Sequence, residues 1–160
     1  MGAGKSTVGK KLARKLGYTF YDLDKAFEHK YKTTVDLFFH KYGETVFRQL
    51  EHELLALTFT FENTVISTGG GTPCFHNGMN LINQNGVSLY IKLSPEALYR
   101  RLTDAKKRRP LVANKSADEL KEFINKKLHE REVYYNKADS LVSGISISVQ
   151  AVVEMLKTST

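Results

Sequence analysis

The first residues of the chain carry a pattern typical of a phosphate-binding loop. Gly2-Ala3-Gly4-Lys5-Ser6-Thr7 matches the second half of the motif G-x-x-x-x-G-K-[ST], and a segment of helical period follows directly. Glycines let the backbone curl so that successive N–H groups point at a phosphate, and the N-terminus of the following helix adds a positive dipole. Lys5 would then reach the β- and γ-phosphates of a nucleotide, and the hydroxyl of Ser6 would bind Mg²⁺.

Two other interpretations of this terminus leave Lys5 and the helix unexplained. One is a flexible Gly/Ser tail, and the other is the N-myristoylation pattern Met-Gly-x-x-x-Ser, with Gly2 and Ser6 in place. The first glycine of the full motif would fall before Met1, and so would the buried strand that aims such a loop. We therefore expect that a chain starting at Met1 is shortened at its N-terminus and is poorly soluble or inactive.

Two carboxylates lie at the end of the first strand that the sequence predicts. Asp22 and Asp24 are two positions apart, so both can face the same side of a sheet. Ligands bind at the carboxyl ends of strands in open α/β sheets. One carboxylate can hold Mg²⁺ through water, and the other can accept a proton from a substrate hydroxyl. The alternative is a helix N-cap at Asp24 and a solvated Asp22.

The remaining candidate residues bind anions. The run Gly69-Gly70-Gly71 can present consecutive N–H groups to a carboxylate, although a tight strand-to-helix turn explains it equally well. Arg48 and Glu51 are one helical turn apart, a spacing that more often marks an exposed ion pair. Arg131, taken alone, is also more often a surface residue.

Short apolar runs alternate with longer segments of helical period, which favours an α/β fold. A helix is predicted to end at Gly17, another to stop at Gly43, and a third to start with Thr72 as N-cap and Pro73 as its first residue. A capping box, Ser116 to Glu119, opens a long later helix. Strands are predicted over residues 18–23, 64–68, 87–93 and 140–143.

Composition indicates one globular domain with an anionic ligand. The 160 residues include 24 Lys or Arg and 17 Asp or Glu, for a formal charge of +7, and residues 100–115 alone carry +6. The single cysteine, Cys74, fits a reducing compartment, so we expect a cytoplasmic protein. No apolar run is long enough to span a membrane, and residues 100–115 contain no aromatic side chain for base stacking. We expect neither membrane nor nucleic-acid binding.

Taken in order, these residues resemble shikimate kinase, a P-loop kinase of the nucleoside-monophosphate-kinase-like group. The resemblance covers essentially the whole chain, and only the phosphate loop is specific by itself. The matching pieces are Gly-x-Gly-Lys-Ser, Asp22-x-Asp24, Phe47-Arg48-x-x-Glu51, Gly69-Gly70-Gly71, Arg109-Pro110-Leu111, and Arg131 with Tyr134.

The resemblance implies a role for each candidate. Gly2, Ala3, Gly4, Lys5, Ser6 and Thr7 would bind ATP, with Arg101 by the adenine and Arg109 as a lid arginine. Mg²⁺ would be held by Ser6 directly and by Asp22 through water. The shikimate site would consist of Asp24 as the base, Arg48 and Arg131 on the carboxylate, and the lining residues Gly69, Gly70 and Gly71.

The implied architecture is a single domain, 1–160, with three α/β/α layers around a parallel sheet of order 2-3-1-4-5, strand 1 being absent. Residues 25–59 would form the shikimate-binding helical segment and residues 103–115 the lid. We expect a monomer that transfers the γ-phosphoryl group of ATP to the 3-hydroxyl of shikimate. The rivals are another small-metabolite kinase such as gluconate kinase, a nucleic-acid-binding domain, and a truncated domain without activity.

Overall fold

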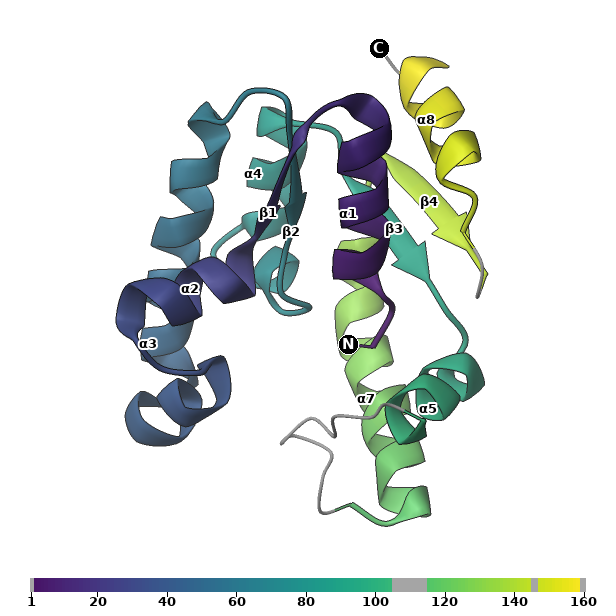
Figure 1. The fold of residues 1–160 in the computed structure, drawn as a ribbon. Helices are drawn as coiled ribbons and strands as arrows, with labels where there is room; N and C mark the ends of the chain where they lie inside the picture. Colours follow the sequence, from purple (N-terminus) through teal and green to yellow (C-terminus); the bar gives the residue numbers. More distant parts are fainter. Residues whose placement is uncertain (1, 105–114, 145–146, 159–160) are drawn as a thin grey trace.

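The computed structural model describes residues 2–104, 115–144 and 147–158, in which helices and strands alternate as predicted (Figure 1). The strands are β1 (Thr19–Asp22), β2 (Thr64–Ser67), β3 (Leu89–Lys92) and β4 (Ser140–Ser143). The α-helices are α1 (Lys5–Leu16), α2 (Leu23–Tyr31), α3 (Val35–Leu57), α4 (Gly78–Asn85), α5 (Pro95–Thr103), α7 (Ala117–Tyr135) and α8 (Val149–Thr158). Two short 3₁₀ helices are η1 (Thr58–Thr60) and η2 (Thr72–Cys74). None of the described helices is long and apolar enough to cross a lipid bilayer.

The strands form two parallel pairs. β1 pairs with β2, with Thr19 opposite Thr64, and β3 pairs with β4, with Leu89 opposite Ser140. In the predicted order 2-3-1-4-5, β1 and β2 are strands 2 and 3, and β3 and β4 are strands 4 and 5. Both predicted pairings, and the parallel direction of each pair, are therefore confirmed. Within the described residues no strand lies between β2 and β3, where that order places strand 1.

Helices cover the strands from two sides. α1 and α8 lie in front of the strands in Figure 1, and α4 and α7 lie behind them. In the front layer, Leu12 of α1 packs with Val152 and Val153 of α8, against Val65 and Leu89 of the strands. This arrangement is the three-layer α/β/α architecture that the sequence predicts.

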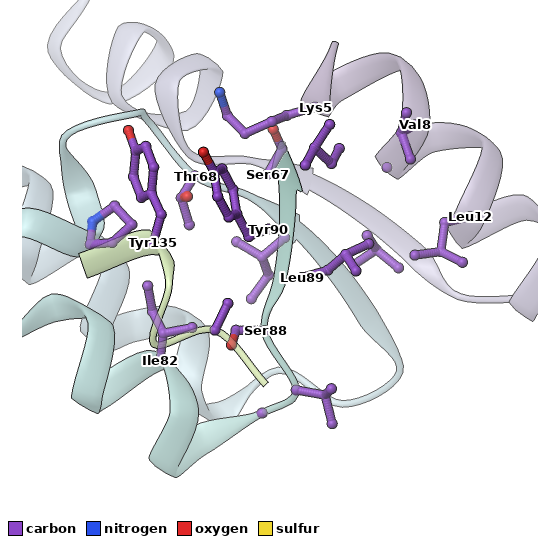
Figure 2. A pocket seen from close by; sticks show the side chains of 18 of the residues that line it. Lys5, Val8, Leu12, Ser67, Thr68, Ile82, Ser88, Leu89, Tyr90 and Tyr135 are labelled. Carbon is purple, nitrogen blue, oxygen red and sulfur yellow. The ribbon is translucent and has the colours of Figure 1, made fainter. Parts of the chain in front are cut away.

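A groove of about 610 Å³ runs between β2 and β3. Figure 2 shows Leu12 of α1, Leu89 of β3 and Ile82 of α4 among its apolar side chains. Lys5 lies at the end of the groove where β2 finishes at Ser67. The groove therefore leads from the apolar interior to the phosphate loop.

A separate aromatic core holds α2 against α3. Phe27 is only 1% exposed, and its ring lies 4.5 Å from the ring of Tyr31, 5.0 Å from Phe38 and 4.8 Å from Phe47. Phe47 directly precedes Arg48 on α3, so this core fixes the part of the helix that carries the candidate arginine.

One predicted helix start is wrong. Thr72 does not cap a helix: Gly71 is the N-cap of η2, and α4 begins only at Gly78. The hydroxyl of Thr72 instead donates to Oε1 of Glu51 at 2.7 Å. The Thr-Pro pattern is a local signal, and a carboxylate 21 residues away in the sequence takes the hydroxyl that a cap would use.

The predicted stop at Gly43 is seen as a break inside α3. Gly43 has φ 80° and ψ 169°, a conformation that is essentially restricted to glycine, and the helix resumes at Glu44. The break separates the first turns of α3 from the segment that carries Arg48.

Gly43→Ala should lower the free energy of unfolding by about 1–3 kcal/mol, because the added Cβ is strained at positive φ. No heavy atom lies within 4 Å of that Cβ, so the loss would come from the backbone alone. Gly86→Ala is the matched control, since Gly86 has an extended φ of 173° and is equally unobstructed. Urea unfolding measures the free energy of unfolding of both variants. Equal losses would contradict the assignment of the effect to the positive φ of Gly43.

Candidate active site

The phosphate loop has the backbone that its glycines predict. Gly2 and Gly4 have positive φ angles of 67° and 84°, and α1 begins immediately afterwards at Lys5. The N-cap residue is Gly4, which has no side chain to occupy the first N–H groups of α1. These donors and the helix dipole form an anion-binding end next to Lys5.

Arg101 of α5 braces this loop. Its Nη1 donates to the carbonyl oxygen of Ala3 at 2.9 Å, and a Cβ on Gly4 would lie 2.9 Å from the same nitrogen. Gly4 therefore permits both the left-handed backbone and the close approach of the guanidinium. The adenine contact expected of Arg101 stays a prediction.

The two candidate metal ligands lie side by side. The hydroxyl of Ser6 donates to Oδ2 of Asp22 at 2.7 Å, and Oδ1 of Asp22 accepts from the backbone N–H of Lys25 at 3.2 Å. Asp22 is thus the N-cap of α2, so the alternative of a cap at Asp24 is wrong. The described residues contain no cluster of three His, Cys, Asp or Glu, but a hydroxyl beside a carboxylate is a donor set that suits Mg²⁺ together with phosphate oxygens.

Asp24 does not share the strand with Asp22, as the two-residue spacing suggested. It lies in the first turn of α2 and is exposed. A Cβ on Gly69 would lie 3.0 Å from Oδ1 of Asp24 and 2.8 Å from Oε1 of Glu51. The glycine turn after β2 therefore admits both carboxylates, and the structure brings Asp24 to the same place as the α3 residues.

Arg48 and Glu51 form a buried ion pair, so the exposed pair that is commoner for this spacing is wrong. Nη1 of Arg48 lies 2.6 Å from Oε2 of Glu51, and the two residues are 7% and 4% exposed. Nε and Nη2 of Arg48 both contact Oε1 of Glu44 at 3.1 Å. Thr72 completes the network through the other oxygen of Glu51.

Aromatic rings surround the Arg48 guanidinium. Its Cζ lies 4.6 Å from the ring centroid of Phe75, 5.0 Å from Phe47 and 5.5 Å from Phe39. A Cβ on Gly71 would lie 2.3 Å from Nη2 of Arg48. Gly71 has φ −91°, so the reason for glycine here is space for the guanidinium and not backbone conformation.

Electrostatic effects place Arg131 of α7 near the same turn. Burial raises the pKa of the Cys74 thiol, and the positive charges of Arg131 and Arg48 both act against that rise. The charges of two arginines from different helices, Arg48 of α3 and Arg131 of α7, therefore both act on Cys74 of η2. Arg48, paired with Glu44 and Glu51, lies against Gly71, and Arg131 acts on Cys74 three residues later.

Several residues of this site were missed from the sequence. The hydroxyl of Tyr135 donates to the carbonyl oxygen of Gly70, and nothing in the sequence pattern singles Tyr135 out. Glu44, four residues before Arg48, had a findable signal in its i,i+4 spacing. Arg109 and most of the predicted lid, residues 103–115, lie outside the described residues.

Comparison with known proteins identifies the family. The family model described as "Shikimate kinase" matches residues 1–159. The chain belongs to the shikimate kinase family. A shikimate kinase from Phocaeicola vulgatus is 42% identical, with 98% of this chain and 92% of that protein covered. One from Flavobacterium johnsoniae is 41% identical, with 98% and 94% covered.

Solved shikimate kinases have the same fold. The crystal structure of the enzyme from Bacteroides thetaiotaomicron matches with a TM-score of 0.94 at 40% identity and covers 98% of this chain and 94% of its own. The enzyme from Acinetobacter baumannii, solved in complex with shikimate, matches with a TM-score of 0.88 at 28% identity, with 99% and 89% covered. The predicted family and P-loop kinase fold are both confirmed.

Glu51 should give stability a specific pH dependence. Burial raises the pKa of Glu51 above its ordinary 4.5, while Arg48 and Thr72 oppose the rise. The folded state then holds the proton more tightly than the unfolded chain, so this contribution is full below pH 4.5 and is lost as pH rises through the raised pKa.

The free energy of unfolding of the unmodified protein should therefore fall, relative to that of Glu51→Gln, as pH rises from 4.5 toward neutrality. Urea unfolding at a series of pH values measures the difference. Glu53→Gln, an exposed position on the same helix, is the control. If the free energies of unfolding of Glu51→Gln and of the unmodified protein change in parallel with pH, the raised pKa of Glu51 is contradicted.

Proposed function

We propose that this chain catalyses the shikimate kinase reaction, the transfer of the ATP γ-phosphoryl group to the 3-hydroxyl of shikimate, with the residues named above. The observation that carries this assignment is the convergence at the glycine turn. Asp24 and the Arg48–Glu51 pair, from two helices, lie against Gly69 and Gly71, and the charge of Arg131, from a third helix, acts on Cys74 just after this turn. A base beside two arginines is what an acceptor with a hydroxyl and a carboxylate requires.

The nucleotide would bind at the start of α1. The N–H groups of residues 2–7 and the ammonium of Lys5 would neutralise the β- and γ-phosphates. Arg101 keeps the loop in shape through the Ala3 carbonyl. Ser6 directly, and Asp22 through water, would hold Mg²⁺, which would neutralise charge on the phosphates; the 2.7 Å approach of the two side-chain oxygens supports that role.

The acceptor would bind at the opposite side of Asp24. Arg48 and Arg131 offer N–H donors to the shikimate carboxylate, and the buried Arg48–Glu51 pair fixes the orientation of one of the two donors. With the carboxylate held, the ring hydroxyls point toward Asp24. Orientation of this kind is the main contribution that a protein makes to phosphoryl transfer.

In the reaction, the oxygen of the 3-hydroxyl of shikimate would form a bond to the γ-phosphorus, and Asp24 would accept the proton that this hydroxyl loses. The bond between that phosphorus and the bridging oxygen breaks, and the electron pair leaves with ADP. Lys5 stabilises the charge that develops on the phosphate oxygens. Arg109, as a lid residue, would add to that stabilisation.

Measuring ADP release with Mg²⁺ and ATP decides the function. Shikimate should stimulate release strongly, and gluconate, the acceptor of the rival small-metabolite kinase, should not. A gluconate response, or release that neither acceptor changes, would overturn the proposal. A nucleic-acid-binding function would show instead as oligonucleotide binding that weakens steeply with salt.

The carboxylate contacts predict a change in KM alone. Arg131→Ala and Arg48→Lys should each raise the KM for shikimate roughly 10- to 100-fold, the loss expected for hydrogen bonds to a charged group, with the KM for ATP unchanged. Lysine is chosen at position 48 because alanine would leave Glu51 buried without a partner. Arg14→Ala, exposed on α1, is the control. An unchanged shikimate KM in both variants would remove the arginines from the site.

The base role of Asp24 predicts a loss of kcat. Asp24→Asn keeps the size of the side chain but cannot take up the proton, so kcat should fall roughly 10²- to 10⁴-fold. Asp118→Asn is the matched control, because Asp118 also lies in the first turn of a helix, α7, and tests the loss of a dipole-stabilising charge. Near-full kcat in Asp24→Asn would require another base.

A further inference from the structure

Tyr135, the last residue of α7, makes a partly buried contact with the glycine turn. Its hydroxyl donates a hydrogen bond to the carbonyl oxygen of Gly70, 65 positions away in the sequence. Its ring packs on the ring of Tyr90 of β3, with centroids 5.0 Å apart (Figure 2). The Tyr135 side chain therefore contacts β3 through its ring and the glycine turn through its hydroxyl.

Tyr135 and Arg131 lie on the same face of α7, because they are four residues apart on a helix. Burial raises the pKa of the Tyr135 phenol, and the positive charge of Arg131 opposes the rise. The one-turn spacing on α7 makes the two side chains neighbours on the helix surface. The hydrogen bond from Tyr135 to Gly70 therefore fixes the last turn of α7, which also carries Arg131.

Gly70, which accepts this hydrogen bond, lies at the centre of the candidate substrate site. Gly70 lies between Gly69, which admits Asp24, and Gly71, which lies against Arg48. Arg48 reaches this turn through Glu51 and Thr72. The two arginines stand on different helices, so the glycine turn is the element that both helices contact.

Among the described residues, two other polar contacts near this end of α7 are more exposed. The ion pair between Lys92 and Glu132, at 2.7 Å, is 41% and 36% exposed, and such pairs hold little. Asn83 donates to the carbonyl oxygen of Lys137 at 2.7 Å, but this contact is exposed and lies beyond the end of the helix.

We propose that Tyr135 is a positioning residue for the acceptor carboxylate: its hydrogen bond to Gly70 sets the place of Arg131 relative to Arg48. This inference rests on the proposed role of the two arginines. It makes Tyr135 a determinant of shikimate affinity, although the phenol contacts neither the reacting hydroxyl nor the phosphates.

Tyr135→Phe isolates the hydroxyl, because the ring can still pack on Tyr90. The KM for shikimate should rise roughly 2- to 10-fold, the factor that corresponds to one hydrogen bond, while kcat and the KM for ATP stay unchanged. Tyr99→Phe, on α5 with its ring beside Lys121, is the control and should change none of the three constants. Equal changes in both substrates' constants would mean a general structural role and would overturn the inference.

A double-variant cycle separates this inference from the proposed function. If Tyr135 acts through Arg131, Tyr135→Phe should raise the shikimate KM in the unmodified protein but not in an Arg131→Ala background. Additive effects would overturn the inference. If Arg131→Ala raises the shikimate KM but Tyr135→Phe does not, the inference is also overturned, and the proposed function stands. If Arg131→Ala has no effect on the shikimate KM, the carboxylate site itself is rejected.

Discussion

The buried ion pair between Arg48 and Glu51 is the constraint on which the candidate site depends. Two charges of low exposure are tolerated only when their remaining donors and acceptors find partners. Glu44, Thr72 and three aromatic rings provide these partners, and they come from both α3 and the turn after β2. The need to satisfy one arginine therefore draws the helical lobe, α2 with α3, onto the strand ends.

The junction of β1 and α2 joins the proposed acceptor site to the phosphate loop. Asp22 ends the strand and contacts Ser6 of the phosphate loop, while Asp24, two residues later, faces the glycine turn. A strand that passes directly into a helix turns these neighbouring carboxylates toward different partners. In the proposed binding mode, local geometry at this one chain segment would set the distance between the phosphates and the acceptor.

How far the sequence predicts the molecule depends on whether the signal is local. The glycine-rich loop, the stop at Gly43 and the Ser116 capping box act through their own backbone, and the structure has all three as predicted. The Thr72 cap failed, and Tyr135 went unnoticed, because each is decided by a distant partner, Glu51 and Gly70 respectively. The Arg48 guanidinium likewise packs on Phe75, which follows η2 and lies 27 positions away in the sequence. Such long-range contacts leave no period or spacing in the sequence.

Glu44 has a consequence for how the arginine can be used. Its side chain is 54% exposed, and a single oxygen accepts from both Nε and Nη2 of Arg48. A ligand carboxylate that takes these N–H groups must send Glu44 back into water, so binding exchanges one anion for another on the same cation. The gain in free energy is the difference between two similar ion pairs, which favours rapid exchange of the bound acid over tight retention.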